Sequence, residues 1–221
     1  LADPSAVVFD LDGTLVDTVE TRIESWLKTF EEIGVKAEHD HVARLIGADG
    51  KRLAKEVAQA AGKRIDDDRA EGVDKRSGEI YDEINTNPKP IAGVRQLLLA
   101  LSASNLPWAI ATSSRREQTT VSVAALKLPT APRIVDGSHV KNAKPAPDLL
   151  VLAAQQLRTP PATTWYVGDA SWDMLAAKAA GMIGIGVAYG AVRGDGLREA
   201  GARVVTTHRS ILADLRRRGA L

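Results

Sequence analysis

The sequence predicts an α/β protein built on a doubly wound parallel sheet, with a smaller helical domain inserted near the start of the chain. From residue 91 onward, short apolar segments of strand length alternate with helical patterns, which is typical of a parallel sheet covered by helices on both faces. One further strand pattern, Val7-Val8-Phe9, stands close to the N-terminal end. A chain of 221 residues is long enough for such a core and one small additional domain.

The segment between this first strand and residue 91 contains helical patterns and no strand pattern. Ile23, Trp26 and Phe30 fall at helical spacing, and Gly34 is a suitable end for that helix. Three further helical patterns follow, and the prolines at 88 and 90 mark the return of the chain. We therefore predict a helical insert over residues 17–86, standing over the strand ends of a core made of residues 1–16 and 87–221.

The remaining elements of the core are expected in a regular order. The patterns predict a helix to about 104, a strand over 108–111, a helix over about 115–126, a strand near 134, a helix over 147–157, a strand over 165–167, a helix over 171–180, a strand over 183–187, a short helix near 197, a strand over 203–205 and a last helix from about 210.

The composition is that of an ordinary globular protein and argues against several classes of function. Lys and Arg number 29 against 28 Asp and Glu, so there is no basic excess of the kind that binds nucleic acid or an anionic membrane. The absence of cysteine excludes thiolate catalysis and fits a cytoplasmic location. No secretion signal or membrane-spanning pattern is visible, and because Leu1 is not a methionine we expect that the natural chain begins earlier.

The first strand pattern ends in two carboxylates, and this is the most informative stretch of the chain. Asp10 and Asp12 are one strand period apart, so that their side chains can point the same way, and Gly13 lets the backbone turn after them. Two carboxylates placed so close together repel each other unless a divalent cation lies between them or one of them holds a proton. This chemistry suits phosphoryl transfer through an aspartyl intermediate.

A calcium-binding loop is an alternative interpretation of the same acids, and the spacing argues against it. Counted from Asp10, the sixth residue is Leu15 where such a loop needs glycine. The twelfth residue is Thr21 where it needs glutamate.

Other predicted strands also end in residues with suggestive chemistry. Thr112, Ser113 and Ser114 follow the strand over 108–111 and precede a helix, where hydroxyl and free N–H groups can receive a phosphate, although the same residues also suit a helix N-cap. Lys144 stands directly before Pro145 and is either a solvated surface charge or a fixed cation for phosphate oxygens.

The strand over 165–167 is followed by two acids four residues apart, Asp169 and Asp173. They suit a metal site at the strand end, or they complement the dipole of the helix that begins there. Because the carboxyl ends of parallel strands meet at one edge of a sheet, the acids, hydroxyls and lysine of all these segments are expected at one place.

The order of these motifs resembles the haloacid dehalogenase superfamily. The segment Asp10-Leu11-Asp12-Gly13-Thr14 matches its first motif, and the strand ending in Thr112, the Lys144-Pro145 pair and the Gly168-to-Asp173 segment match the three that follow. The resemblance implies an enzyme, a phosphatase with a Rossmann-like core. The insert at 17–86 resembles the α-helical cap of the branch that contains phosphoglycolate phosphatases and β-phosphoglucomutases.

The resemblance also implies a role for each matching residue. Asp10 would be the nucleophile and a metal ligand, Asp12 the general acid and base that also offers a backbone carbonyl to the metal, and Asp169 a ligand of Mg²⁺. The phosphoryl group would be held by Thr112, Ser113 and Lys144, and Asp173 would support the metal or Lys144 from behind. The expected cofactor is Mg²⁺ and the expected partner is a small phosphorylated metabolite, phosphoglycolate-like or sugar-phosphate-like, bound by a monomer or homodimer.

Substrate selection is expected in the insert. Lys51 and Arg52 follow a glycine-containing loop and are candidates for contacts with the leaving group. A phosphonoacetaldehyde hydrolase, which needs a cap lysine, and a sugar phosphomutase of the same superfamily are alternatives, and Gly50 stands where mutases carry an arginine. A receiver-like phosphoacceptor without enzymatic activity is the alternative of another class, and Asp12 argues against it because a hydrolytic base would shorten the life of a phosphoaspartate.

Overall fold

The strand β1 (Ala6–Phe9) lies in the middle of a six-stranded parallel sheet, in a computed structural model that describes residues 1–190 and 194–221. Its neighbours are β4 (Trp108–Ala111) and β6 (Thr164–Gly168), and Phe9 lies opposite Ile110 on one side and Val167 on the other. The full order is β5-β4-β1-β6-β7-β8, with β5 at Ile134–Val135, β7 at Ile183–Val187 and β8 at Val204–Thr206. The predicted fold class is confirmed.

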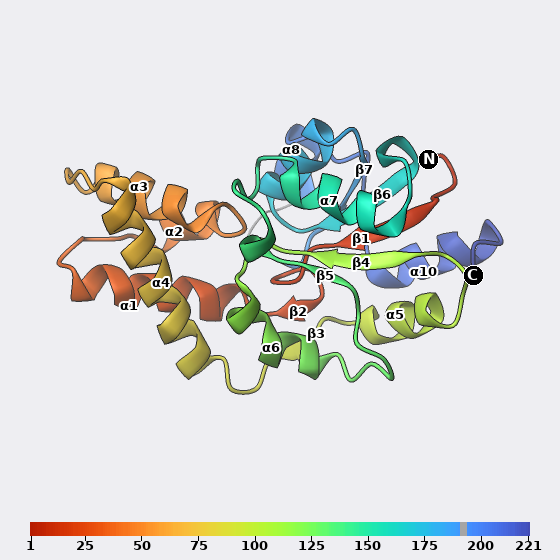
Figure 1. The fold of residues 1–221 in the computed structure, drawn as a ribbon, viewed down its shortest axis with the longest axis horizontal. Helices are drawn as coiled ribbons and strands as arrows, with labels where there is room; N and C mark the ends of the chain where they lie inside the picture. Colours follow the sequence, from red (N-terminus) through yellow and green to blue (C-terminus); the bar gives the residue numbers. More distant parts are fainter. Residues whose placement is uncertain (191–193) are drawn as a thin grey trace.

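Helices cover both faces of this sheet, and the alternation of side chains along β1 explains why. Val7 and Phe9 are buried against α5 (Val94–Ser102) and α10 (His208–Arg217), whereas Val8 is buried against α7 (Asp148–Leu157) and α8 (Ser171–Ala179) on the opposite face (Figure 1). The remaining helical elements are α6 (Arg116–Ala125), α9 (Gly194–Glu199), η1 (Gly137–His139) and η2 (Pro161–Thr163).

Four helices fill the segment between β1 and the rest of the sheet, and they pack around a hydrophobic cluster of their own. They are α1 (Val19–Glu32), α2 (His39–Leu45), α3 (Gly50–Ala60) and α4 (Asp67–Ile84). In α1 the residues Ile23, Trp26 and Phe30 form the buried face, and the last two rings stack with centroids 5.6 Å apart. In Figure 1 these helices stand to one side of the sheet; we call them the helical insert.

The chain leaves and re-enters the core through a small pairing that the sequence did not predict. β2 (Val16–Asp17) pairs antiparallel with β3 (Lys89–Pro90), so that Val16 lies opposite Pro90. Each strand has two residues, which is too short for an alternating pattern to be recognised. The pairing brings both ends of the helical insert to one place beside β1. In the described part of the chain, none of the helices combines the length and the apolar character that crossing a membrane requires.

Candidate active site

The carboxyl ends of β1, β4 and β6 bring the acids and hydroxyls of four sequence segments to one edge of the sheet. Asp10 follows β1 directly, Thr112 follows β4, and Asp169 follows β6. Lys144 comes from the loop before α7 and reaches the same place. All four side chains are buried, so the polar groups collected here must satisfy one another or a ligand.

Lys144 is held between two carboxylates. Its Nζ donates to Asp10 Oδ1 at 2.5 Å and to Asp173 Oδ1 at 2.7 Å. Burial alone would lower the pKa of Lys144, but the two carboxylates outweigh burial and raise this pKa above its usual range. The ammonium is therefore a permanent cation beside Asp10.

Asp173 acts on this site through Lys144 rather than from the cavity. Its Oδ1 also accepts a hydrogen bond from the Tyr166 hydroxyl at 3.0 Å, and its Oδ2 accepts the backbone N–H of Ala170 at 2.9 Å. Both oxygens thus have donors, which fixes the carboxylate and makes it the anchor of the lysine. Gly168 leaves room for it, since a Cβ there would lie 2.4 Å from the Asp173 side chain.

Asp169 completes a cluster of acids. One carboxylate oxygen from each of Asp10, Asp169 and Asp173 lies within 4.8 Å of the others. The Thr14 hydroxyl donates to Asp169 Oδ1 at 2.7 Å. A Cβ on Gly190 would lie 1.6 Å from Asp169 Oδ2, so a glycine is needed for the backbone to approach this carboxylate so closely.

The pKa values of Asp10 and Asp169 in this cluster are raised, chiefly by burial. Burial, the largest influence, raises the pKa of Asp10 to about 7, with Lys144 opposing the shift and Asp173 adding to it. Burial and the charges of Asp173 and Asp10 raise the pKa of Asp169 well above its usual range. A divalent cation would favour the ionised carboxylates, and oxygen donors are the ligands that Mg²⁺ and Ca²⁺ prefer. Because both Asp173 oxygens already accept hydrogen bonds, Asp10 and Asp169 are the members that fit a metal.

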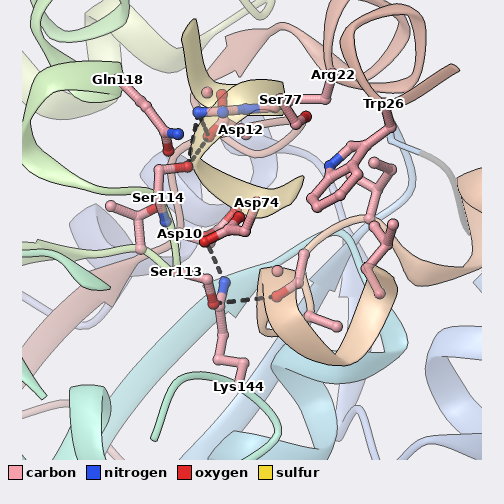
Figure 2. A pocket seen from close by; sticks show the side chains of 17 residues that line it. Asp10, Asp12, Arg22, Trp26, Asp74, Ser77, Ser113, Ser114, Gln118 and Lys144 are labelled. Carbon is pink, nitrogen blue, oxygen red and sulfur yellow. Dashed lines mark hydrogen bonds and ion pairs between the residues drawn. The ribbon is translucent and has the colours of Figure 1, made fainter. Parts of the chain in front are cut away.

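A cavity opens between these residues and the helical insert (Figure 2). The core contributes Asp10, Thr112, Ser113 and Lys144 to its wall, and the space inside it that is open to water-sized molecules is about 60 Å³, which is room for a few water molecules. The hydroxyl of Ser113 donates to the backbone carbonyl of Gly47 at 3.2 Å, which joins the β4 loop to the insert. The core also contributes Asp12, Ser114 and Gln118, and the insert lines the remaining wall with Arg22, Trp26, Ile46, Gly47, Ala48, Gly50, Leu53, Asp74, Ser77 and Gly78.

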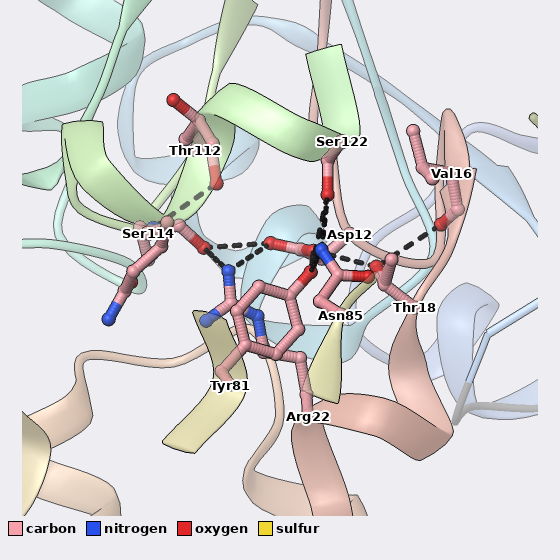
Figure 3. A network of polar contacts seen from close by, with 12 residues as sticks. Asp12, Val16, Thr18, Arg22, Tyr81, Asn85, Thr112, Ser114 and Ser122 are labelled. Atoms are coloured by element: carbon pink, nitrogen blue, oxygen red, sulfur yellow. Dashed lines mark hydrogen bonds and ion pairs between the residues drawn. The ribbon is translucent and has the colours of Figure 1, made fainter. Parts of the chain in front are cut away.

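Asp12 also lines this cavity, but its carboxylate is held by a network on the side of the insert (Figure 3). Its Oδ1 accepts hydrogen bonds from Thr18 Oγ1 at 2.6 Å and from the Tyr81 hydroxyl at 3.1 Å. Its Oδ2 accepts from Ser114 Oγ at 2.7 Å and from Arg22 Nη2 at 3.0 Å. Burial would raise the pKa of Asp12, but Arg22 and the hydroxyl donors hold it below its usual range.

Arg22 and Tyr81 are the members of the site that the sequence interpretation missed. Arg22 lies four residues before Trp26 and eight before Phe30, so it shares their buried face of α1. An arginine in the apolar face of an amphipathic helix is the signal that could have identified it. Tyr81 had no comparable signal, because its contact with Asp12 spans 69 residues of sequence.

The two cations that the sequence suggested for substrate selection lie elsewhere. Lys51 is a half-buried residue that forms an ion pair with Glu71 at 3.6 Å. Arg52 pairs with Glu56 and lies over the ring of Trp172, 4.6 Å from its centroid. Neither belongs to the wall of the cavity, whereas the neighbouring Gly50 does. Successive residues of a helix lie on different sides of it. Because Gly50 at the start of α3 lines the cavity, the next two side chains, Lys51 and Arg52, point away from it.

Comparisons with known proteins agree with this geometry. A family model described as haloacid dehalogenase-like hydrolase matches residues 7–187. The chain is 30% identical over 210 residues to N-acetylmuramic acid 6-phosphate phosphatase of Pseudomonas putida, covering 92% of each chain, and 29% identical to β-phosphoglucomutase of Bacillus subtilis, covering 84% of each. The crystal structure of a hydrolase from Pseudomonas syringae superposes with a TM-score of 0.90 at 31% identity, covering 98% of this chain and 99% of that one.

Proposed function

The chain belongs to the haloacid dehalogenase-like hydrolases and is a phosphatase, and we propose that it hydrolyses a small phosphomonoester, phosphoglycolate-like or sugar-phosphate-like, through a phosphoaspartate formed on Asp10. The observation that carries this proposal is the contact of Lys144 Nζ with Asp10 Oδ1 at 2.5 Å, at the wall of the cavity. A buried ammonium fixed on a carboxylate orients that carboxylate and attracts an anionic phosphoryl group to it.

Asp10 would begin the reaction by attacking phosphorus with a carboxylate oxygen. Asp12 is ionised while Arg22 and the hydroxyl donors lower its pKa, and it would take up a proton when it turns from them toward the bound substrate. The bond from phosphorus to the ester oxygen breaks as the bond to Asp10 forms, and the departing alkoxide takes this proton from Asp12. Water then attacks phosphorus of the phosphoaspartate and loses a proton to Asp12, which releases phosphate and restores the Asp10 carboxylate. Thr112, Ser113 and Lys144 would hold the phosphoryl oxygens through both steps.

A Mg²⁺ ion fits the donors that Asp10, Asp169 and the backbone carbonyl of Asp12 offer, and when bound it would neutralise charge on the phosphoryl group. The raised pKa values of Asp10 and Asp169 support this part of the proposal, because both carboxylates gain from a nearby cation. Asp173 would hold Lys144 in place throughout.

We assign residues 17–86 the role of a cap over the site. The helical insert forms much of the wall of the cavity, which has space for a few water molecules in this structure, and it would move away to admit a substrate. Contacts that join it to the core, such as Ser113 to Gly47 and the backbone bond from Asp49 N–H to Lys144 O at 2.9 Å, would form when the cap closes and excludes water.

The names of two relatives support a sugar phosphate within this substrate class. One is named as a phosphatase of N-acetylmuramic acid 6-phosphate and the other as a β-phosphoglucomutase. A phosphonoacetaldehyde hydrolase is disfavoured, since Lys51 does not line the cavity and Lys144 is, among the described residues, the one lysine that does. A sugar phosphomutase and a receiver-like phosphoacceptor are separated from a phosphatase by their products.

Phosphate release from a panel of small phosphomonoesters, with and without Mg²⁺, tests the proposal in the native chain and in Asp10→Asn. We expect many turnovers that require both the metal and Asp10. Isomerisation of a sugar phosphate without phosphate release would indicate a mutase, and one phosphate per chain would indicate a phosphoacceptor. Full activity in Asp10→Asn would show that Asp10 is not the nucleophile.

A further inference from the structure

Arg22 is the cation that the helical insert places in the wall of the cavity, opposite the phosphate-binding side formed by Lys144 (Figure 2). Its side chain is 11% exposed. Its guanidinium carbon lies 3.4 Å from the centroid of the Tyr81 ring, and this stacking fixes the plane of the fork. In the described parts of the chain, Lys144 and Arg22 are the two cations that line the cavity. If Lys144 holds the phosphoryl group, Arg22 is left for a different anion.

The guanidinium is only partly used by the protein. Nη2 donates to Asp12 Oδ2 at 3.0 Å and to Ser114 Oγ at 2.7 Å (Figure 3). Within the described residues, Nε and Nη1 donate to no protein acceptor. Nε and Nη1 lie on different edges of the guanidinium, and each can form a parallel pair of hydrogen bonds to a carboxylate only together with Nη2. Such a pair becomes available when Asp12 leaves Nη2.

Arg22 forms its ion pair with Asp12, and the proposed reaction requires Asp12 to move from Arg22 to the substrate. Asp12 has to approach the ester oxygen on the phosphorus at Asp10, whereas all four hydrogen bonds of its carboxylate come from Thr18, Arg22, Tyr81 and Ser114. When that carboxylate moves toward the substrate, Arg22 loses its ion-pair partner.

A buried cation without a partner is costly. Asp82 is the nearest remaining acid to influence Arg22, but it is exposed and forms no ion pair with it. Asp74, the other acid in the wall on the insert side, pairs with Arg115 at 3.0 Å. An anionic group of the substrate is therefore the best replacement for the Asp12 carboxylate beside Arg22.

We propose that Arg22 is a specificity-determining residue that binds a carboxylate on the leaving group, so that the preferred substrates are phosphomonoesters of hydroxy acids or acidic sugars. The carboxylate takes the place of Asp12 on Nη2, and pairs there also with a neighbouring nitrogen of the guanidinium, when Asp12 turns toward the ester oxygen. A neutral ester of the same shape leaves Arg22 buried without an anion. This inference rests on the proposed function, because it requires Asp12 to act on the substrate.

Two matched substrate pairs test the inference in the full chain with Mg²⁺. N-acetylmuramic acid 6-phosphate carries a carboxylate that N-acetylglucosamine 6-phosphate lacks, and 3-phosphoglycerate carries one that glycerol 3-phosphate lacks. A hydrogen-bonded charged group is worth about 1.5–3 kcal/mol, so kcat/KM should favour the acidic member of at least one pair by about 10- to 100-fold. In Arg22→Gln that ratio should fall to near one, mainly through a higher KM for the acid, and Arg22→Lys should retain part of it.

Arg76→Gln is the matched control, because Arg76 is a half-buried arginine of α4 that pairs with Glu32 and Glu79 and does not line the cavity. The ratio in this variant should equal that of the native chain. A native enzyme that treats both members of each pair alike would overturn the inference, and this result needs no variant to fold. An equal loss for acidic and neutral esters in Arg22→Gln would also overturn it, since Arg22 would then only position Asp12. Absence of any Asp10-dependent turnover would instead overturn the proposed function.

Discussion

Lys144→Met removes the ammonium that separates Asp10 from Asp173 and keeps a side chain of similar length. The lysine is fully buried and bonds to the two carboxylates at 2.5 and 2.7 Å. Breaking a buried ion pair by removing one partner costs about 3–5 kcal/mol. Asp173 keeps its bonds from Tyr166 and Ala170, so most of the loss falls on Asp10, and we expect the free energy of unfolding to fall by about 4 kcal/mol.

Urea unfolding near pH 8, without divalent metal and followed by circular dichroism, measures this change. With a slope of about 2 kcal/mol per molar, the midpoint should fall by about 2 M. Lys141→Met is the control, since Lys141 is an exposed lysine of the same loop that forms no ion pair with described residues. Adding Asp10→Asn to Lys144→Met should restore about 1–2 kcal/mol, because it removes the carboxylate that Lys144 no longer compensates. A loss below about 1 kcal/mol, or no recovery in the double variant, would refute the assignment of Lys144 as the charge partner of both acids.

Three further predictions follow from the same residues. The pKa of Asp10 rises from 3.8 in the unfolded chain to about 7 in the folded one, so between these values the folded state holds a proton that the unfolded state has lost, and the metal-free protein should lose stability as pH rises through that window. Mg²⁺ should therefore raise Tm more near pH 8 than near pH 5. Equal Tm shifts at the two pH values, or the same shift in Asp169→Asn as in the native chain, would contradict this. Asp12→Asn should reduce kcat/KM far more for alkyl phosphates than for p-nitrophenyl phosphate, whose leaving group needs no proton, and equal losses would argue against a general acid. Gly190→Ala places a Cβ 1.6 Å from Asp169 Oδ2 and should weaken Mg²⁺ binding measured by calorimetry, which an unchanged Kd would disprove.

Much of the fold followed from local sequence patterns. The apolar runs before Asp10, Thr112 and Asp169 are strands, and parallel pairing in register places the residues that follow them at one edge. The charged stretch from Asp66 to Asn85 is α4, whose start is fixed by the Asp66 side chain accepting the backbone N–H of Arg69. Such features depend on spacing along the chain, which a single sequence displays.

The environment of Asp12 could not be predicted from the sequence. Its partners Arg22, Tyr81 and Ser114 lie 10, 69 and 102 residues away, and they meet only because the helical insert folds back over the sheet edge. The sequence suggested Lys51 and Arg52 as the cations that select the substrate, because their loop contains glycines. Whether a side chain points into a cavity, however, depends on the direction in which helix α3 leaves that loop. Tertiary packing of this kind leaves no periodic trace in the sequence.

Direct detection of phosphate on Asp10 would test the central claim. The enzyme would be mixed with its best ester and Mg²⁺, quenched in acid and digested with trypsin, and the peptide over residues 1–22 analysed by mass spectrometry. We predict a phosphate on Asp10 that accumulates in Asp12→Asn, where hydrolysis is slow, and that is absent from Asp10→Asn. Steady turnover with no label on this peptide in either the native chain or Asp12→Asn, or a label on another residue, would contradict the account.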